Sequence, residues 1–247
     1  MCCVLNELKM DNRLKIKLIE IINETKLVKI FKFKPLEGSI PLFSPGQFVF
    51  LYAMINGEEI KRAYSIASSP LDEKLELEIE LVENGKMTSF LHTQTKVGDI
   101  FEINNPQGHF KFIEGKSDKV IMIAGGTGIA PMRSIIRYCT QKNLDTKLVL
   151  FYSSRTKDRI VYKKEFEELV KENPQLKVVN TLTRNQDSDW KGKQGRINKE
   201  MILEEAGDIS ESMFFLCGSI KMVKSMVDMI KEMGVDRTRI KMDIWGS

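Results

Sequence analysis

The sequence predicts two differently built halves: an N-terminal antiparallel β-barrel, followed by a C-terminal doubly wound sheet of parallel strands and helices (a β + α/β architecture). Short strands with few helices fill residues 14–113, whereas apolar runs alternate with amphipathic helices from residue 120 onward. The polar stretch 114–118 separates the two patterns. We therefore expect a barrel domain over residues 8–115 and an α/β domain over residues 116–247.

The barrel strands are expected where apolar and polar residues alternate, a pattern typical of strands with one buried face. Turn-forming pairs such as Asn56-Gly57 and Asn84-Gly85 separate these runs. One short helix is expected after the second pair, over residues 88–93. The main expected strands cover residues 14–19, 28–33, 47–52 and 75–81.

The second half alternates short apolar runs with amphipathic segments, which predicts a parallel sheet with helices on both faces. Such sheets bind ligands beyond the carboxyl ends of their strands. The expected strands cover residues 120–124, 148–152, 176–182, 213–216 and 240–244. The expected helices cover residues 131–142, 162–173, 198–206 and 219–233.

A glycine-rich turn joins the first of these strands to the first helix, and it reads Gly125-Gly126-Thr127-Gly128-Ile129-Ala130-Pro131. Glycines let the backbone turn tightly and approach a ligand. A proline suits the first turn of a helix, because its missing N–H costs nothing there. Free N–H groups and the positive helix end face such a turn, so the sequence predicts a phosphate site.

The composition is that of an ordinary soluble globular protein, with 42% hydrophobic and 29% charged residues among 247. The net charge of +4 is mild, which argues against dedicated nucleic-acid binding and is compatible with an acidic protein partner. No apolar run is long enough for a membrane span, and the N-terminus lacks the apolar core of a signal peptide. A cytoplasmic location is therefore the default expectation.

Metal chemistry is not expected from the sequence. Cys2, Cys3, Cys139 and Cys217 form no Cys-x-x-Cys pair, and the chain has only two histidines. No cysteine cluster could hold an iron–sulfur centre. Redox chemistry, if the protein performs any, must therefore rest on an organic cofactor.

The segment Arg62-Ala63-Tyr64-Ser65 is the most informative part of the barrel half. In an extended segment Arg62 and Tyr64 lie on one face and Ser65 on the other. An Arg fork suits a phosphate, and a Tyr ring can stack on a flat heterocycle. Taken alone, however, such residues more often belong to an ordinary strand with a solvated Arg.

Three motifs together resemble the ferredoxin–NADP reductase family of flavoenzymes: Arg-x-Tyr-Ser, the glycine turn that ends at Pro131, and Cys217-Gly218. Their order and spacing fit the family over residues 46–246. The resemblance implies that the chain binds a flavin with its barrel half and a pyridine nucleotide with its α/β half.

The flavin residues follow from the resemblance. It implies that Arg62 meets the flavin phosphate, that Tyr64 packs on the isoalloxazine ring, and that the Ser65 hydroxyl lies near the reactive N5. A second family motif, Gly-x-x-Ser/Thr at a helix start, and the backbone of the preceding strand add further flavin contacts. These further contacts are Ile79, Glu80, Gly85, Lys86, Met87 and Thr88.

The nucleotide residues also follow from the resemblance, which assigns the pyridine nucleotide to Gly126, Thr127, Gly128 and Pro131. No acidic residue ends the second strand, where a ribose-binding Asp or Glu is common. Relatives that use NADPH carry Ser-Arg after the third strand for the 2′-phosphate, and this chain has the similar pair Thr183-Arg184. NADP(H) is therefore favoured, and NAD(H) stays possible.

The remaining family positions lie near the C-terminus. Cys217 and Gly218 would line the place where the nicotinamide approaches the flavin. Asp243 and Trp245 match a terminal Glu-x-aromatic frame, with Asp one methylene shorter. The resemblance implies that Asp243 relays protons near Ser65 and Cys217, and that the indole covers the flavin. A structural thiol and a packing Trp are the simpler explanations.

The resemblance as a whole implies a flavoprotein oxidoreductase that passes hydride from NAD(P)H to bound FAD, with FMN as the second possible flavin. The chain carries no iron–sulfur segment, so we expect its electrons to reach a separate acceptor, with ferredoxin or flavodoxin as the first choice. Two different functions stay open. One is that of an electron-transfer subunit or nucleotide-binding regulator without turnover of its own, and the second is that of a free-flavin or quinone reductase.

Overall fold

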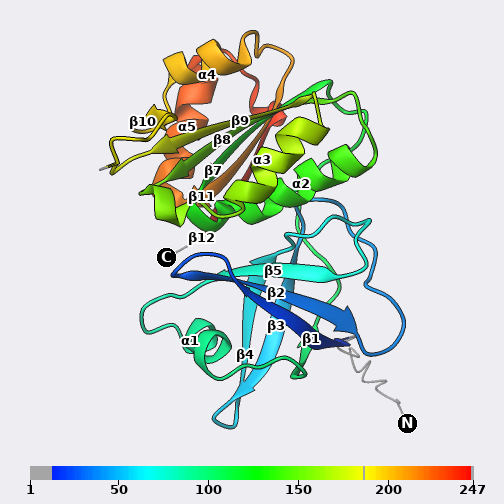
Figure 1. The fold of residues 1–247 in the computed structure, drawn as a ribbon. Coiled ribbons are helices and arrows are strands. Elements are labelled where there is room, and N and C mark those ends of the chain that lie inside the picture. The colour runs from blue at the N-terminus through cyan, green and yellow to red at the C-terminus, as the bar shows by residue number, and fades with distance from the viewer. Residues whose placement is uncertain (1–12, 186, 246–247) are drawn as a thin grey trace, which may run out of the picture.

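The computed structural model describes residues 13–185 and 187–245, which form two six-stranded sheets, one in each half of the chain (Figure 1). The first half contains β1 (Leu14–Asn23), β2 (Val28–Pro35), β3 (Phe48–Ile55), β4 (Glu58–Ser65), β5 (Leu75–Glu80), α1 (Lys86–Thr93) and β6 (Ile100–Ile103). These strands pair antiparallel in the order β4-β3-β6-β1-β2-β5.

The second half alternates strands and helices and pairs all its strands in parallel, in the order β10-β9-β8-β7-β11-β12. Helices α2 and α3 pack on one face of this sheet, and α4 and α5 pack on the other (Figure 1). The elements are β7 (Lys119–Gly125), η1 (Gly126–Gly128), α2 (Ile129–Gln141), β8 (Lys147–Ser154), η2 (Lys157–Arg159), α3 (Lys163–Glu172), β9 (Leu176–Leu182), β10 (Lys193–Gln194), α4 (Lys199–Ala206), β11 (Met213–Ser219), α5 (Ile220–Glu232), η3 (Arg237–Arg239) and β12 (Ile240–Trp245).

The antiparallel sheet curls until its two edge strands approach each other. An isolated antiparallel bridge joins Ile66, which directly follows β4, to Leu77 of β5. Leu75, Leu77 and Ile79 of β5 pack in the barrel core. The glutamates that alternate with them therefore point out of the barrel, toward the second half of the chain. The predicted β + α/β architecture is thus confirmed.

Apolar packing continues across the junction of the two halves. Phe110 and Phe112 follow the last barrel strand and belong to the core cluster that α2 and α3 form on the parallel sheet. The ring centroids of Phe110 and Phe215 lie 5.2 Å apart in an edge-to-face arrangement. Ala67, just beyond β4, lies in the same cluster. This packing brings the ends of the predicted cofactor strands toward each other.

The differences from the predicted elements are local. Helix α1 begins at Lys86 instead of residue 88, and α2 begins at Ile129 because the 3-10 turn η1 passes directly into it. Strands β6 and β10 were not among the expected runs, since they are too short for a periodic pattern. Strand β4 contains the segment 62–65, which was expected to be extended, and begins earlier, at Glu58. The domain boundaries at residues 115 and 116 stay a prediction, and residues 8–12 lie outside the described part. None of the described helices is long and apolar enough to cross a membrane.

Candidate active site

A cleft of about 460 Å³ lies between the two halves. The barrel contributes Glu80 at the end of β5 and Val82 just after it, and the hairpin between β1 and β2 adds Thr25 and Leu27. The α/β half contributes the glycine turn and the carboxyl ends of its central strands β7, β8 and β11. The cleft therefore lies where a doubly wound sheet binds its ligand. Its opposite wall is the end of β5, and Arg62, Tyr64 and Ser65 of β4 do not line it.

The glycine turn leaves room for a phosphate because its glycines carry no side chain. A Cβ built on Gly128 would lie 2.2 Å from the carbonyl oxygen of Cys217, so β11 can approach the turn only if this residue is Gly. Gly126 has a φ of +55°, a region that glycine adopts without strain. Helix α2 has no acidic residue in its first turn and no side-chain cap. The residues of the turn that line the cleft are Gly125, Gly126, Thr127 and Gly128, directly before α2, where the positive end of the helix favours a phosphate.

The predicted residues near the C-terminus meet at the edge of the parallel sheet. Cys217 is fully buried and pairs with Ala124 of β7 on one side and with Asp243 of β12 on the other. Gly218 lines the cleft. Burial raises the pKa of Asp243 above its ordinary value, although the Ile244 N–H donates to its Oδ1 at 3.1 Å and opposes this shift.

Trp245 closes β12, and its backbone is in register with Ser219 at the end of β11. The predicted role of its indole concerns a side chain outside the described residues. That Asp243 relays protons and that the Trp245 indole packs on the flavin both stay predictions.

Strand β4 carries three of the predicted flavin residues, and each has a different environment. The Arg62 side chain is exposed, and its one hydrogen bond within the described chain goes to the adjacent Lys61 carbonyl at 2.7 Å. Tyr64 packs against the barrel core, and burial raises its pKa, so its phenol stays neutral. The Ser65 hydroxyl is buried and has no hydrogen-bond partner among the described residues. A buried orphan hydroxyl is uncommon, so it fits a strand that receives a polar ligand.

The end of β5 and the start of α1 form the second predicted flavin region. Glu80 lines the cleft, but Ile79 does not, because its side chain lies in the barrel core and its carbonyl is 3.0 Å from His92 Nε2. The Thr88 hydroxyl accepts from the Val82 N–H at 3.2 Å and donates to the Gly85 carbonyl at 3.2 Å. These bonds shape the turn into α1.

The first turn of α1 has no acidic residue and no side-chain cap, which leaves its N–H groups for an anion. Of the two residues between Gly85 and Thr88, Lys86 is exposed and pairs with Glu58 at 3.1 Å, whereas Met87 is buried in the barrel core. Any flavin contact of Met87 would therefore involve its backbone.

A second cavity of about 250 Å³ adjoins the cleft and shares Ser153, Thr183, Ser219 and Met222 with it. Thr183 thus lies where a nucleotide that spans both cavities would pass. Arg184 is exposed in the same turn but lines neither cavity, and its N–H donates to the Arg155 carbonyl at 2.8 Å.

Two cations that the sequence did not single out, Arg196 and Lys221, line the second cavity. Lys221 lies in the first turn of α5, where the helix dipole disfavours a positive charge. This unfavourable placement is the signal in the sequence that could have revealed it.

Comparisons with known proteins agree with the two halves. An oxidoreductase FAD-binding domain matches residues 15–112, and an oxidoreductase NAD-binding domain matches residues 122–228. The FAD/NAD-binding domain of a nitric oxide dioxygenase from Vibrio cholerae superposes with a TM-score of 0.85 over 95% of this chain and 99% of its own, at 22% identity. At that identity the likeness shows the fold alone.

Three curated relatives have reductase names. The glycine betaine monooxygenase reductase subunit of Chromohalobacter salexigens is 28% identical over 96% of this chain, which spans only 65% of that relative. Ferredoxin--NADP reductase B of Sorangium cellulosum is 29% identical, with 92% of this chain and 95% of the relative covered. NADH-cytochrome b5 reductase 1 of Dictyostelium discoideum is 32% identical, with 86% and 75% covered. The chain therefore belongs to the ferredoxin–NADP reductase family of FAD- and NAD(P)-dependent oxidoreductases.

Proposed function

We propose that this protein is a reductase that takes hydride from NAD(P)H onto bound FAD and passes electrons to a separate carrier protein. The observation that carries the proposal is the composition of the cleft. Its walls combine the end of the FAD-half strand β5 with the glycine turn of the NAD half. Two cofactors that meet at one cleft are what hydride transfer between them requires.

The chain's own groups fit a flavin in the barrel half. Arg62 and the free N–H groups of α1 suit its phosphates, and the orphan Ser65 hydroxyl suits a polar atom of the ring. When bound, FAD would supply hydride acceptance and electron release that no amino-acid side chain offers. The contribution of the protein is to bind and orient: Tyr64 supports the ring, and Gly218 lets the nicotinamide approach the backbone.

NADPH is the favoured nucleotide because the second cavity is basic. Arg196 and Lys221 line it together with the hydroxyls of Thr183 and Ser225, and no acidic side chain is part of its lining. An acid at the end of the second strand would select the free ribose of NADH. Arg184, which follows Thr183 in the turn after β9, remains a candidate partner of the 2′-phosphate. NADH stays the second candidate nucleotide, as the name of the Dictyostelium relative illustrates.

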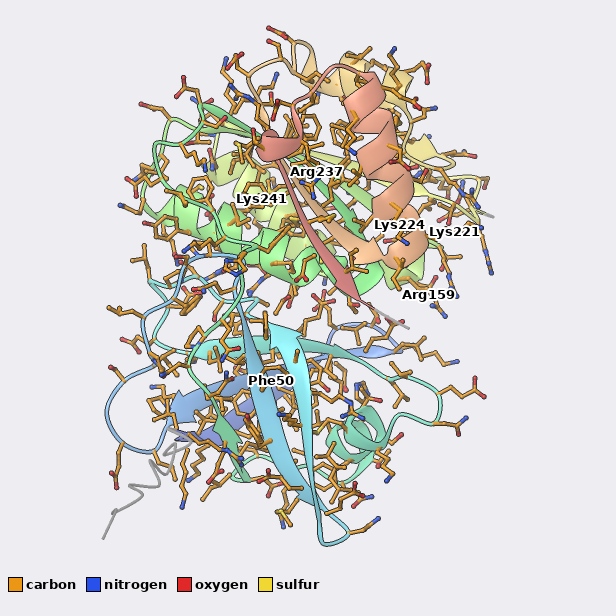
Figure 2. All side chains as sticks on the ribbon, turned by 180° about the vertical axis from the view of Figure 1, so that it is seen from behind. Phe50, Arg159, Lys221, Lys224, Arg237 and Lys241 are labelled. Carbon is orange, nitrogen blue, oxygen red and sulfur yellow. The ribbon has the colours of Figure 1, made fainter. Side chains whose placement is uncertain are left out.

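An acidic carrier protein, with ferredoxin or flavodoxin as the first choice, is the proposed acceptor. Figure 2 shows Lys221 and Lys224 of α5, Arg237 of η3 and Lys241 of β12 on the same side of the α/β half. None of these four cations lies within 4.0 Å of a carboxylate of the described chain. Unpaired charges of one sign steer an oppositely charged partner and give a salt-dependent association rate. The expected cytoplasmic location remains a prediction.

The names of the relatives support a second candidate, the reductase component of a multi-protein oxygenase. The glycine betaine monooxygenase reductase subunit and a phenol 2-monooxygenase reductase component are both similar to this chain. In that role the chain would deliver electrons to a dedicated partner. A free-flavin or quinone reductase, and a binding subunit without turnover, are the functions against which both candidates are tested.

Purified protein separates these functions. After reconstitution with FAD, we expect NADPH to bleach the flavin absorbance in anaerobic stopped flow, and reduced protein to transfer electrons to ferredoxin or flavodoxin faster at low salt. Faster turnover with free FMN or a quinone than with any carrier would favour the free-flavin or quinone reductase. Flavin or nucleotide binding without any reduction would favour the binding subunit.

A further inference from the structure

The segment that follows the flavin strand is bonded directly to the helix that follows the nucleotide turn. Strand β4 ends at Ser65, and the next residues, including Ala67 and Ser68, are buried at the junction of the halves. In the α/β half η1 passes into α2, so Arg133 and Ser134 lie in the second turn of the helix that begins at the glycine turn. Only a few residues separate the flavin motif from Ala67 and Ser68, or the nucleotide turn from Arg133 and Ser134.

Two side chains of α2 reach backbone carbonyls of the β4 extension, residues 66–69. Arg133 Nη1 donates to the Ala67 carbonyl at 2.8 Å, and Ser134 Oγ donates to the Ser68 carbonyl at 2.6 Å. Arg133 is 5% exposed, and Ser134, Ala67 and Ser68 are fully buried. Water therefore cannot readily replace a removed donor, and a carbonyl that loses its donor becomes an unsatisfied buried group.

Arg133 is fixed by groups from two further elements. Its Nη1 lies 2.8 Å from Glu76 Oε2 of β5, as a close ion pair, and its Nε donates to Glu165 Oε2 of α3 at 2.8 Å. Its guanidinium carbon lies 4.4 Å from the centroid of the Tyr162 ring. A planar guanidinium with partners in three directions has little freedom to move.

The β4 extension is held equally firmly from its own half. The Ala67 N–H donates to the Glu76 carbonyl at 2.9 Å, and the Ser68 hydroxyl accepts from the Glu76 N–H at 3.1 Å. Helix α2, strand β5 and the β4 extension therefore form one bonded unit. One end of this unit is the flavin motif, and the opposite end is the nucleotide turn.

We propose that Arg133 and Ser134 are positioning residues for hydride transfer, which set the separation of the flavin strand and the nucleotide turn. Neither residue lines the cleft or the second cavity. The inference rests on the proposed function, because both cofactors must bind for positioning to matter. Reacting atoms must approach to about 3–3.5 Å, and a displacement of about 1 Å costs roughly 100-fold in rate.

A neighbouring contact provides a matched control. Arg137, one turn further along α2, pairs with Asp72 of the barrel half at 2.9 Å and with Glu165 at 2.9 Å. It also joins the two halves, but it bonds side chains and not the carbonyls beside the flavin motif. A general weakening of the junction should therefore affect Arg137→Gln as much as Ser134→Ala.

The test compares Ser134→Ala, Arg133→Lys and Arg137→Gln with the wild type. Lys keeps the charge, but one ammonium cannot replace a fork that serves three partners. At saturating NADPH we expect flavin reduction to slow by about 5- to 100-fold in the first two variants and by less than about twofold in Arg137→Gln. Flavin content and NADP⁺ affinity should stay near wild type, and 4-deuterated NADPH should give a larger isotope effect. In protein without cofactors, amide exchange over residues 66–68 should accelerate in Ser134→Ala but not in Arg137→Gln; the Ser69 amide is left out because it donates to Asp72, the partner of Arg137.

Reduction of Ser134→Ala at the wild-type rate, or equal slowing in Arg137→Gln, would overturn the inference and leave the proposed function intact. Unchanged amide exchange over residues 66–68 in Ser134→Ala, measured without any cofactor, would also overturn it. Wild-type protein that binds flavin and NADPH but shows no flavin reduction contradicts the proposed function itself, and the inference falls with it.

Discussion

The two helix starts proposed to bind phosphates are built in opposite ways. At α1 the turn is shaped by a side chain, since the Thr88 hydroxyl bonds the backbone of Val82 and Gly85. At α2 the turn depends on the absence of a side chain, since a Cβ on Gly128 would lie 2.2 Å from the Cys217 carbonyl oxygen. A Cβ on Gly85 would also be close, 2.5 Å from Thr88 Oγ1, but that atom belongs to a side chain that can rotate away. The flavin site should therefore lose affinity gradually as polar groups are removed, whereas the nucleotide turn should fail when a single carbon is added.

The strongest way to break this comparison is Gly128→Ala. The added methyl meets backbone, which cannot rotate away as a side chain can, so the turn and β11 must separate. We expect flavin reduction by NADPH to slow by about 100-fold or more, with flavin content unchanged. Gly126→Ala is the matched control, because its Cβ would have nothing within 4 Å and only its φ of +55° adds strain. Similar rates for the two variants would contradict the packing explanation.

Arg62→Met tests the graded behaviour of the flavin site. Loss of a charge-assisted phosphate contact costs about 1.5–3 kcal/mol, which corresponds to roughly 10- to 150-fold weaker flavin binding. Lys61→Met removes the same charge from the preceding residue, whose ammonium instead lies 5.4 Å from the Phe50 ring centroid. Equilibrium dialysis with FAD should separate the two variants. Full flavin retention by Arg62→Met would remove Arg62 from the site.

The second cavity, proposed to hold the 2′-phosphate of NADPH, should depend on its positive charges. Arg196→Ala and Lys221→Ala should each raise the KM for NADPH by about tenfold and leave the KM for NADH nearly unchanged, because only NADPH carries a 2′-phosphate. Arg184→Ala should have a smaller effect in the same direction. Lys224→Ala, one turn further along α5 and outside both cavities, is the control. An equal loss for both nucleotides would refute the 2′-phosphate assignment.

The junction between the two halves should respond to acid. Burial acts to raise the pKa of Asp72, but hydrogen bonds from Arg137 and Gln141 outweigh it and lower the pKa below its ordinary value. The stabilisation that Asp72 provides is therefore present above the ordinary carboxyl pKa and disappears as the pH falls through the lowered value. Asp72→Asn should cost about 1 kcal/mol of unfolding free energy near neutral pH, and less as the pH falls. Urea titrations at several pH values check this; a constant difference would contradict it.

Much of the architecture was accessible from local sequence patterns. The period-two run of β5 and the apolar stripes of the helices correctly predicted strands and helices, since each pattern depends only on nearby residues. The glycine turn was also predicted at a helix start, and Pro131 lies in the first turn of α2 as expected. Short elements were missed: β6, from Ile100 to Ile103, has too few residues to show a period.

The missed site residues depend on distant contacts. Arg133 and Ser134 meet carbonyls 66 residues earlier in the chain, and no local pattern records that separation. Arg196 follows β10 and Lys221 follows β11, and the two come together because these parallel strands end at the same edge of the sheet. Motif resemblance identified Thr183 and Arg184 as a pair, but only the fold shows that Thr183 lines both cavities and that Arg184 lines neither.

The most direct test of the central claim is anaerobic titration of the flavin-loaded protein with NADPH, followed by absorbance. Because the end of β5 and the nucleotide turn border one cleft, we expect one equivalent of NADPH to reduce one equivalent of bound FAD. Protein that accepts no FAD under any loading condition, or that holds FAD but leaves it oxidised in excess NADPH and NADH, would contradict the claim.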